Sequence, residues 1–208
     1  MAGFQLYIDA GHGGTDPGTV HPVLKGPTWA GDFNGPRVIH EAHLTALAAP
    51  VIESLAKEWG IKTFVGPTGP RAAERVVHIR EWGEKVKAEG DTPVVVSIHW
   101  NSANDSCASG CEVLVRPDAE GKVLDAAAEV NRYLAGNLSW HYPVRNRGVK
   151  RAKLAVIGVY PQSSMLVEVA FLSNAFECFW WAKFADEAGL HLLANAILQP
   201  IGKLWGKE

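Results

Sequence analysis

The sequence has little cysteine, no excess of either charge and no long apolar run. Three cysteines in 208 residues are too few for the disulfide framework of a secreted scaffold. Cys107 and Cys111 lie close together but lack the further ligands of a structural zinc site. Twenty Lys and Arg against 22 Asp and Glu exclude nucleic acid as an expected main partner. No apolar stretch reaches the roughly 18 residues of a membrane span, so membrane insertion is not expected.

The first residues also lack the pattern of an export signal. No Lys or Arg precedes Lys25, and residues 1–8 contain only a short apolar run. The charged and apolar regions of a signal peptide are therefore both missing. We expect synthesis in the cytoplasm without a signal peptide, so that any action outside the cytosol requires another route of release.

What is present is the composition of an ordinary globular protein. A length of 208 residues and a hydrophobic fraction of 47% suit one domain with its own core. With no internal repeat, linker or low-complexity segment, residues 1–208 are interpreted as a single domain, and a monomer is favoured. Strand-like and helix-like segments alternate, which predicts an α/β fold. We expect a twisted, mostly parallel or mixed sheet with helices on both faces.

The pattern of apolar residues predicts where these elements lie. Strands are expected at residues 4–8, 61–65, 94–99, 112–115, 153–159 and 165–169. Helices are expected at residues 38–59, 71–89, 118–140 and 174–204, the last with a break at Gly189. A Gly- and Pro-rich loop from Thr15 to Pro36 follows the first strand, and loops of this length are commonly functional.

Metal-capable side chains follow the ends of two expected strands. His12 lies between glycines after the first strand, and His99 closes the strand at 94–99. Ligands of open α/β sheets bind beyond the carboxyl ends of the strands, so we expect both histidines near Glu168. Taken alone, His99 fits a buried core histidine as well as a ligand. The glycine-rich loop also suits a phosphate, although it matches neither GxGxxG nor a P-loop.

Glu168 is the most informative residue because it lies inside an apolar run, residues 165–172. Burying a carboxylate is costly unless it is paired or held at a metal. A salt bridge to a nearby Arg is the alternative, but a catalytic carboxylate accounts better for this placement.

Two further patterns have weaker links to chemistry. Residues 40–43 read HEAH, which misses the HExxH zinc motif by one residue. Glu41 is also explained as an acidic residue favoured by a helix N-terminus. Trp29 and Trp100 adjoin the expected site and suit stacking on a sugar or a peptide, with a core position as the alternative.

Three segments resemble the motifs of a known family. Residues 8–18 (IDAGHGGTDPG) look like the opening motif of the zinc-dependent N-acetylmuramoyl-L-alanine amidases of the AmiC type. Residues 97–101 (SIHWN) are similar to their second histidine motif, and residues 166–174 (LVEVAFLSN) to their third. The order and spacing of the motifs extend the resemblance over nearly the whole chain.

The resemblance implies an enzyme that carries one Zn²⁺ per chain and acts on peptidoglycan. The bond cut would be the amide between the lactyl group of N-acetylmuramic acid and L-alanine. The ligands implied by the motifs are His12, Glu41 and His99, and the catalytic carboxylate is Glu168.

Neighbouring polar residues complete the expected site. His40 or His43 is the alternative to Glu41 as a ligand. Histidines that bind a metal commonly have their outer ring nitrogen held by a polar partner. Asp9 and Asn101 are the candidates for that role.

The chain is small, has no export signal and leaves no room for the long blocking helix that some regulated bacterial members of the family carry. In these respects it resembles a phage endolysin. Such a lytic enzyme waits in the cytoplasm until the membrane is disrupted. Two other functions remain open. One is a zinc peptidase or carboxypeptidase of the peptidoglycan stem peptide, which analysis of the products would distinguish. The other is a non-catalytic cell-wall-binding module, which would have no need of Glu168.

Overall fold

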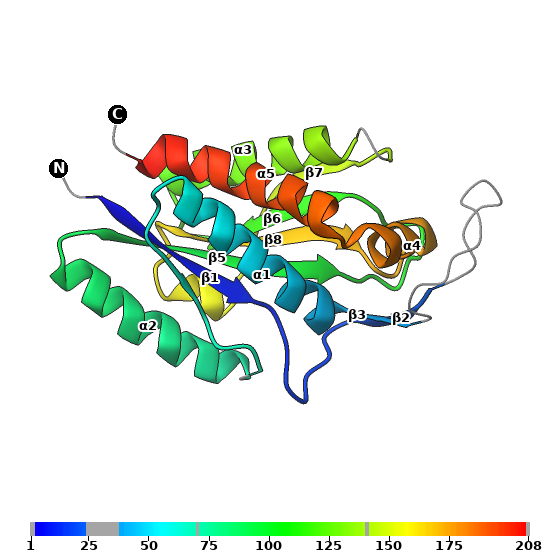
Figure 1. The fold of residues 1–208 in the computed structure, drawn as a ribbon, viewed down its shortest axis with the longest axis horizontal. Coiled ribbons are helices and arrows are strands. Elements are labelled where there is room, and N and C mark those ends of the chain that lie inside the picture. Colours follow the sequence, from blue (N-terminus) through cyan, green and yellow to red (C-terminus); the bar gives the residue numbers. More distant parts are fainter. Residues whose placement is uncertain (1–2, 24–37, 70, 140–141, 207–208) are drawn as a thin grey trace.

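The computed structural model describes residues 3–23, 38–69, 71–139 and 142–206 and contains a central six-stranded sheet (Figure 1). The strands, in their order across the sheet, are β4 (Thr63–Val65), β1 (Phe4–Ala10), β5 (Thr92–Asn101), β8 (Ser164–Phe171), β6 (Cys111–Val115) and β7 (Asn146–Arg151). All neighbouring strands are parallel except β6, which runs antiparallel to β8. A separate antiparallel pair joins β2 (Val20–Pro22) to β3 (Val38–His40).

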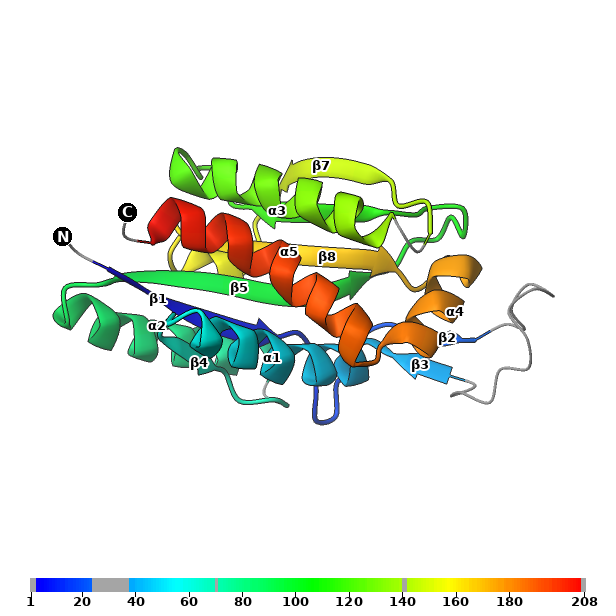
Figure 2. The same cartoon turned by 45° about the horizontal axis from the view of Figure 1, so that its top comes forward.

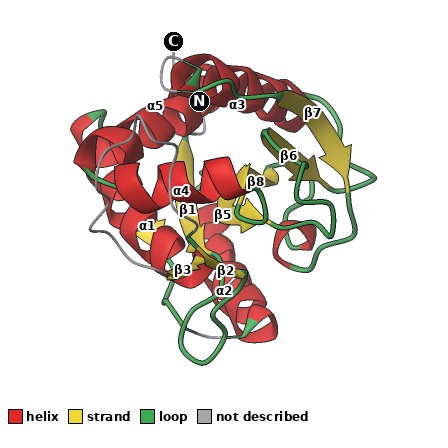
Figure 3. Cartoon of the chain, turned by 90° about the vertical axis from the view of Figure 1, so that its right-hand side faces the viewer, coloured by secondary structure: helices red, strands yellow, loops and turns green. Residues whose placement is uncertain are grey.

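Helices cover both faces of the sheet, as predicted for an α/β fold. The first face packs against α1 (Glu41–Glu58), α3 (Lys122–Leu138) and α5 (Glu187–Trp205) (Figures 1 and 2). The second face packs against α2 (Ala72–Ala88) and a 3₁₀ helix, η2 (Val156–Gly158). The short helix α4 (Ala175–Phe184) follows β8 and lies at the end of the sheet that faces the viewer in Figure 3.

The central strand β5 shows why the sequence forms this layered core. Its residues Val94, Val96 and Ile98 contact the first apolar layer, and Val95 contacts the second. A strand covered on both faces reads as a continuous apolar run rather than an alternating one. Polar residues in such a strand therefore stand out, and they lie toward its carboxyl end.

Three expected elements differ from the structure. The first helix begins at Glu41 rather than at residue 38, because Val38–His40 pairs with β2. The strand expected at residues 153–159 is wrong, because η2 lies there and the edge strand is instead β7. The last helix breaks before Gly189, since the carboxylate of Asp186 caps a new helix by accepting from the Gly189 N–H.

The parallel arrangement decides where a site can form. The carboxyl ends of β1, β5 and β8 lie together at one end of the strands, opposite the end where β1 begins and α5 finishes (Figure 1). The N-terminus of α1 lies at the same end of the strands, since the N–H of Trp100 donates to Glu41. Within the described ranges, none of the helices combines the length and apolarity that crossing a bilayer requires.

Candidate metal centre

Three side chains converge at the C-terminal ends of the parallel strands. His12 comes from the loop after β1, Glu41 is the first residue of α1, and His99 lies near the end of β5. One ligand atom from each lies within 4.8 Å of the others. Nδ1 of His99 is 2.9 Å from Oε1 of Glu41, and Nε2 of His12 is 3.3 Å from Oε2 of Glu41. The structure therefore brings together the three residues that the motifs predict as ligands.

The 3.3 Å separation between Nε2 of His12 and Oε2 of Glu41 fits a tetrahedral zinc site. Ligand atoms bound to Zn²⁺ at about 2.0–2.1 Å lie about 3.3 Å from one another in a tetrahedron. Two imidazoles and a carboxylate are also donors that Zn²⁺ accepts. In the described part of the chain, Nε2 of His99 is buried without a hydrogen-bond partner. The residues present thus fit a divalent cation of this type.

Glycines make room for the three side chains. A Cβ added at Gly11 would overlap the ring of His99, and one at Gly18 would lie 2.6 Å from Oε2 of Glu41. His12 has a φ of 63°, and it is the only non-glycine residue with positive φ among those described. Such strained backbone conformations cluster at functional sites. The Thr45 hydroxyl donates to the carbonyl of Gly11 at 2.5 Å and fixes the loop against α1.

We predict that Gly11→Ala weakens metal binding. The added methyl group overlaps the His99 ring, so either the ring or the β1 loop must move away from Glu41. Metal affinity, measured by competition with a chelator, should fall by roughly tenfold or more, since second-sphere changes commonly cost 10–100-fold.

Gly136→Ala is the matched control for this substitution. Gly136 lies in α3 with no atom within 4 Å of an added Cβ, and alanine stabilises a helix interior by roughly 0.5–1 kcal/mol. Unchanged metal affinity in Gly11→Ala would show that the site tolerates a displaced His99.

Hydrogen bonds hold Glu41 as an anion. Burial alone would raise the pKa of Glu41, but contacts with His12 and His99 and a hydrogen bond from the Thr19 N–H hold it well below its usual range. The N–H of Trp100 donates to Oε1 of Glu41 at 3.0 Å. The hydrogen bond with Glu41 in turn raises the pKa of His12 to about 9, against the opposing effect of burial, and Asp16 adds to the rise. The Glu41 and Asp16 carboxylates thus place negative charge beside His12, where it favours a positive charge, either the proton of His12 or a metal ion in its place.

Glu168 lies next to this group on β8. It is paired with His99 in the register of β5 and β8, so both side chains lie on the same face of the sheet. Its Oε2 is buried without a hydrogen-bond partner in the described ranges. Burial, and then the carboxylates of Glu41 and Glu112, raise the pKa of Glu168 to about 8. No ion pair with an Arg is formed by Glu168 within those ranges, so the salt-bridge alternative has no support.

The predicted partners of the histidine rings are different in the structure. The Asp9 carboxylate accepts from Arg75 at 2.8 Å and from Ser97 at 2.6 Å, and no contact between Asp9 and a histidine ring occurs among the described residues. Asp16, which the sequence analysis did not single out, contacts Nδ1 of His12 at 2.9 Å instead. The sequence could have indicated Asp16 as the partner of His12, because Asp16 is an acidic residue four positions further along in the same motif.

Asn101 also has another partner. Its amide donates to Oε1 of Glu112 at 2.9 Å, and Asn101 contacts no histidine ring in the part of the chain that the structure describes. Glu112 was missed, although it is a carboxylate in an apolar strand, the same signal that identified Glu168. Arg147 was missed as well, because it lies on the edge strand β7, which the sequence pattern did not predict.

Of the two alternatives for Trp100, the structure supports the core position. Only 1% of Trp100 is exposed, and its ring packs edge-on against Trp181, so it belongs to the core and is not available for stacking. Trp29 lies outside the described residues. The three cysteines are free, with Cys107 exposed, and Cys111 and Cys178 buried, the latter in α4.

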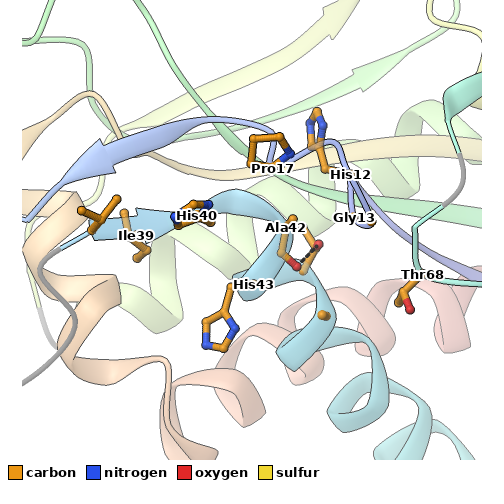
Figure 4. A pocket seen from close by; sticks show the side chains of 12 residues that line it. His12, Gly13, Pro17, Ile39, His40, Ala42, His43 and Thr68 are labelled. Atoms are coloured by element: carbon orange, nitrogen blue, oxygen red, sulfur yellow. Dashed lines mark hydrogen bonds between the residues drawn. The ribbon is translucent and has the colours of Figure 1, made fainter.

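A cavity of about 540 Å³ borders His12 and is lined by the loop after β1, by β3 and by the first turns of α1 (Figure 4). His40 and His43 both line it, together with Pro17 and Thr68. In Figure 4 the ring of His43 points away from His12. Of the described residues, only His12, Glu41 and His99 form a group with metal-binding spacing, so the geometry favours Glu41 over either alternative histidine.

Comparisons with known proteins agree on one family. A family model described as "N-acetylmuramoyl-L-alanine amidase" (Amidase_3) matches residues 6–203. "Uncharacterized protein YqiI" of Bacillus subtilis (strain 168) is 29% identical over 202 residues, covering 97% of this chain and 84% of that protein.

Two solved structures share the fold over nearly the full length. The catalytic domain of CwlV, an N-acetylmuramoyl-L-alanine amidase from Bacillus (Paenibacillus) polymyxa var. colistinus, is 26% identical with a TM-score of 0.71. The match covers 96% of this chain and 97% of that one. An N-acetylmuramoyl-L-alanine amidase from Clostridium difficile 630 is 22% identical with a TM-score of 0.73, covering 98% and 97% of the two chains.

Proposed function

The chain belongs to the N-acetylmuramoyl-L-alanine amidase family and is a peptidoglycan amidase, and from this premise we propose that its activity depends on one Zn²⁺ held by His12, Glu41 and His99. The observation that carries the proposal is the convergence of these three ligand atoms within 4.8 Å. The bond cut is the amide between the lactyl group of N-acetylmuramic acid and L-alanine.

The metal site leaves the proton transfers to the protein. When bound, Zn²⁺ supplies Lewis-acid chemistry, polarising a carbonyl and making hydroxide available near neutral pH. Glu41 offers both carboxylate oxygens to the centre, and hydrogen bonds from Thr19 and Trp100 fix its orientation. Asp16 holds the outer nitrogen of His12, which fixes the ring and its tautomer.

Glu168 is the proposed general base and general acid. Its Oε2, which is buried with no hydrogen-bond partner among the described residues, takes a proton from the attacking water and delivers it to the leaving nitrogen of L-alanine. A carboxylate with a raised pKa is suited to this double role at neutral pH. The same burial and neighbouring charges that raise the pKa of Glu168 therefore prepare it for proton transfer.

We predict that metal removal abolishes the activity. Elemental analysis should find about one Zn per chain, because three protein ligands with an open fourth position form one catalytic site. Dialysis against a chelator should reduce hydrolysis of peptidoglycan to background, and added Zn²⁺ should restore it. Circular dichroism serves as the control for an intact fold. Full activity in protein shown to be metal-free would end the zinc proposal.

The bond cut is tested by mass spectrometry of digested peptidoglycan. An amidase releases peptides with a free L-alanine amino group and leaves the lactyl acid intact on the glycan. Products cut within the stem peptide would indicate the peptidase alternative. Binding to cell walls without soluble products would indicate a wall-binding module.

We also propose a lytic, endolysin-type role in which the enzyme reaches the wall after the membrane is disrupted. A quarter of the His12 side chain is exposed, and His12 borders a cavity, so one of the three proposed ligands is accessible to solvent. Cells expressing the protein should stay intact until a membrane-permeabilising agent is added and then lose turbidity rapidly. Lysis before permeabilisation, or none after it, would contradict this role.

A further inference from the structure

A row of charged side chains crosses the sheet beside the metal centre. His99, Glu168 and Glu112 are paired in register on β5, β8 and β6, so their side chains share one face. Arg147 on β7 extends the row, because its Nε donates to Oε2 of Glu112 at 2.8 Å. The row thus runs from the ligands, past the proposed acid and base, to a guanidinium at the edge of the sheet.

The guanidinium of Arg147 is held in a fixed position. Its Nη1 lies 3.4 Å from the carbonyl of Ser109, and its Cζ lies 4.7 Å from the centre of the Phe171 ring. Glu112 is fixed in turn by Asn101. The side chain of Arg147 is 27% exposed and that of Glu112 only 12%. Arg147 is therefore an oriented cation whose side chain stays partly exposed.

The proposed mechanism sets the direction in which substrate lies along this row. Glu168 must face the leaving nitrogen, so the stem peptide extends from the metal centre past Glu168 toward β6 and β7. The glycan, on the other side of the scissile carbonyl, extends toward His12 and the cavity of Figure 4. This step rests on the proposed function.

The charges along this path match the stem peptide. Its second residue is a D-glutamate linked through its γ-carboxyl, which leaves the α-carboxylate free, or amidated in some walls. A two-residue segment spans roughly 7 Å, and β7 lies about 10 Å from β8 at a strand spacing of about 4.8 Å. The Arg147 side chain reaches back across β6 to Phe171 at the end of β8, which covers the remaining distance.

We propose that Arg147 is a specificity-determining residue that binds the free α-carboxylate of the second stem-peptide residue. A guanidinium is suited to this because its planar fork matches a carboxylate. Glu112 already occupies Nε and the Ser109 carbonyl accepts from Nη1, which leaves Nη2 without a partner among the described residues. The alternative is that Arg147 only neutralises Glu112 and has no contact with substrate.

The test compares two soluble muramyl-peptide substrates that differ only at that group, one with the free α-carboxylate and one with its carboxamide. Wild-type protein should prefer the carboxylate by about tenfold or more in kcat/KM, as expected for a charge-assisted hydrogen bond. In Arg147→Gln the ratio of the two values should fall toward one. Arg147→Lys, which keeps the charge but not the fork, should give an intermediate ratio.

Arg132→Gln is the matched control. It removes one exposed Arg from α3, on the other face of the sheet, where that side chain pairs with Glu129. Its substrate ratio should equal that of wild type. Because each ratio comes from one preparation, partial unfolding or lost zinc in a variant cancels out.

The outcomes separate this proposal from the amidase mechanism. If wild-type protein cleaves neither substrate, the proposed function fails. If wild-type protein cleaves both but Arg147→Gln keeps the wild-type ratio, the amidase proposal stands and Arg147 is only a partner of Glu112. A wild-type ratio near one would overturn the carboxylate proposal in the same way.

Discussion

Replacing His12, Glu41 or His99 with alanine should remove Zn²⁺ and amidase activity together. The three ligand atoms lie within 4.8 Å of one another, and two remaining ligands do not form a stable catalytic zinc site. We expect zinc content to fall from about one per chain to a small fraction, with activity at background. Glu41→Ala should have an effect as large as either histidine substitution, because Glu41 contacts both rings.

His40→Ala and His43→Ala are the matched controls for this experiment. Both residues flank Glu41 and line the neighbouring cavity, but neither belongs to the group with metal-binding spacing. They should keep full zinc content. The ligand assignment is wrong if Glu41→Ala keeps zinc while one of these two substitutions loses it.

The parts of the fold that the sequence predicts are those with an unambiguous apolar pattern. The buried strands β5 and β8 and the amphipathic helix α3 lie where expected, because each depends on burial of its own residues. The edge strand β7 was missed because residues Asn146–Arg151 are polar and basic, and its pairing with β6 depends on backbone hydrogen bonds. The first helix was extended too far because Val38–His40 is apolar enough to continue it, while its real partner is β2.

The same distinction applies to the candidate site, where the motif residues are predictable from the sequence and their partners on distant elements are not. The residues of the three motifs, His12, His99 and Glu168, follow from their places at strand ends. The partners of Asp9 could not be predicted, because Arg75 comes from α2, 66 positions away in the sequence. That buried ion pair, with side chains 5% and 2% exposed, joins α2 to β1 just before the His12 loop. Contacts of this kind depend on the packing of distant elements.

The effect of replacing Glu168 with glutamine distinguishes a catalytic from a structural carboxylate. Glutamine keeps the size of the side chain but cannot transfer a proton, and general acid–base catalysis contributes roughly 10²–10⁴-fold. We expect kcat to fall by about that factor, or about 2.7–5.4 kcal/mol of transition-state stabilisation. Zinc content should not change, because Glu168 lies outside the ligand group. Binding to cell walls should persist as well.

The stability of the same variant gives an independent check with a defined pH dependence. The pKa of Glu168 is raised to about 8 by burial and by the Glu41 and Glu112 carboxylates, against about 4.3 in an unfolded chain. Above pH 4.3 the unfolded state ionises first, so Glu168 destabilises the metal-free protein increasingly up to about pH 8. Glu168→Gln removes this effect, and the metal-free variant should melt a few °C higher than metal-free wild type at pH 8 but equally at pH 4.

The turnover and the melting temperature of Glu168→Gln together distinguish a catalytic role of Glu168 from a structural one. If Glu168 stabilised the fold by pairing with another group, its replacement by a neutral residue would lower the melting temperature. Oε2 of Glu168 is instead buried without a partner in the described ranges. A variant that melts lower at pH 8 and keeps its turnover per zinc would make Glu168 a structural residue. A variant that melts higher and loses turnover would show that the protein retains an unfavourable buried carboxylate because its chemistry requires one.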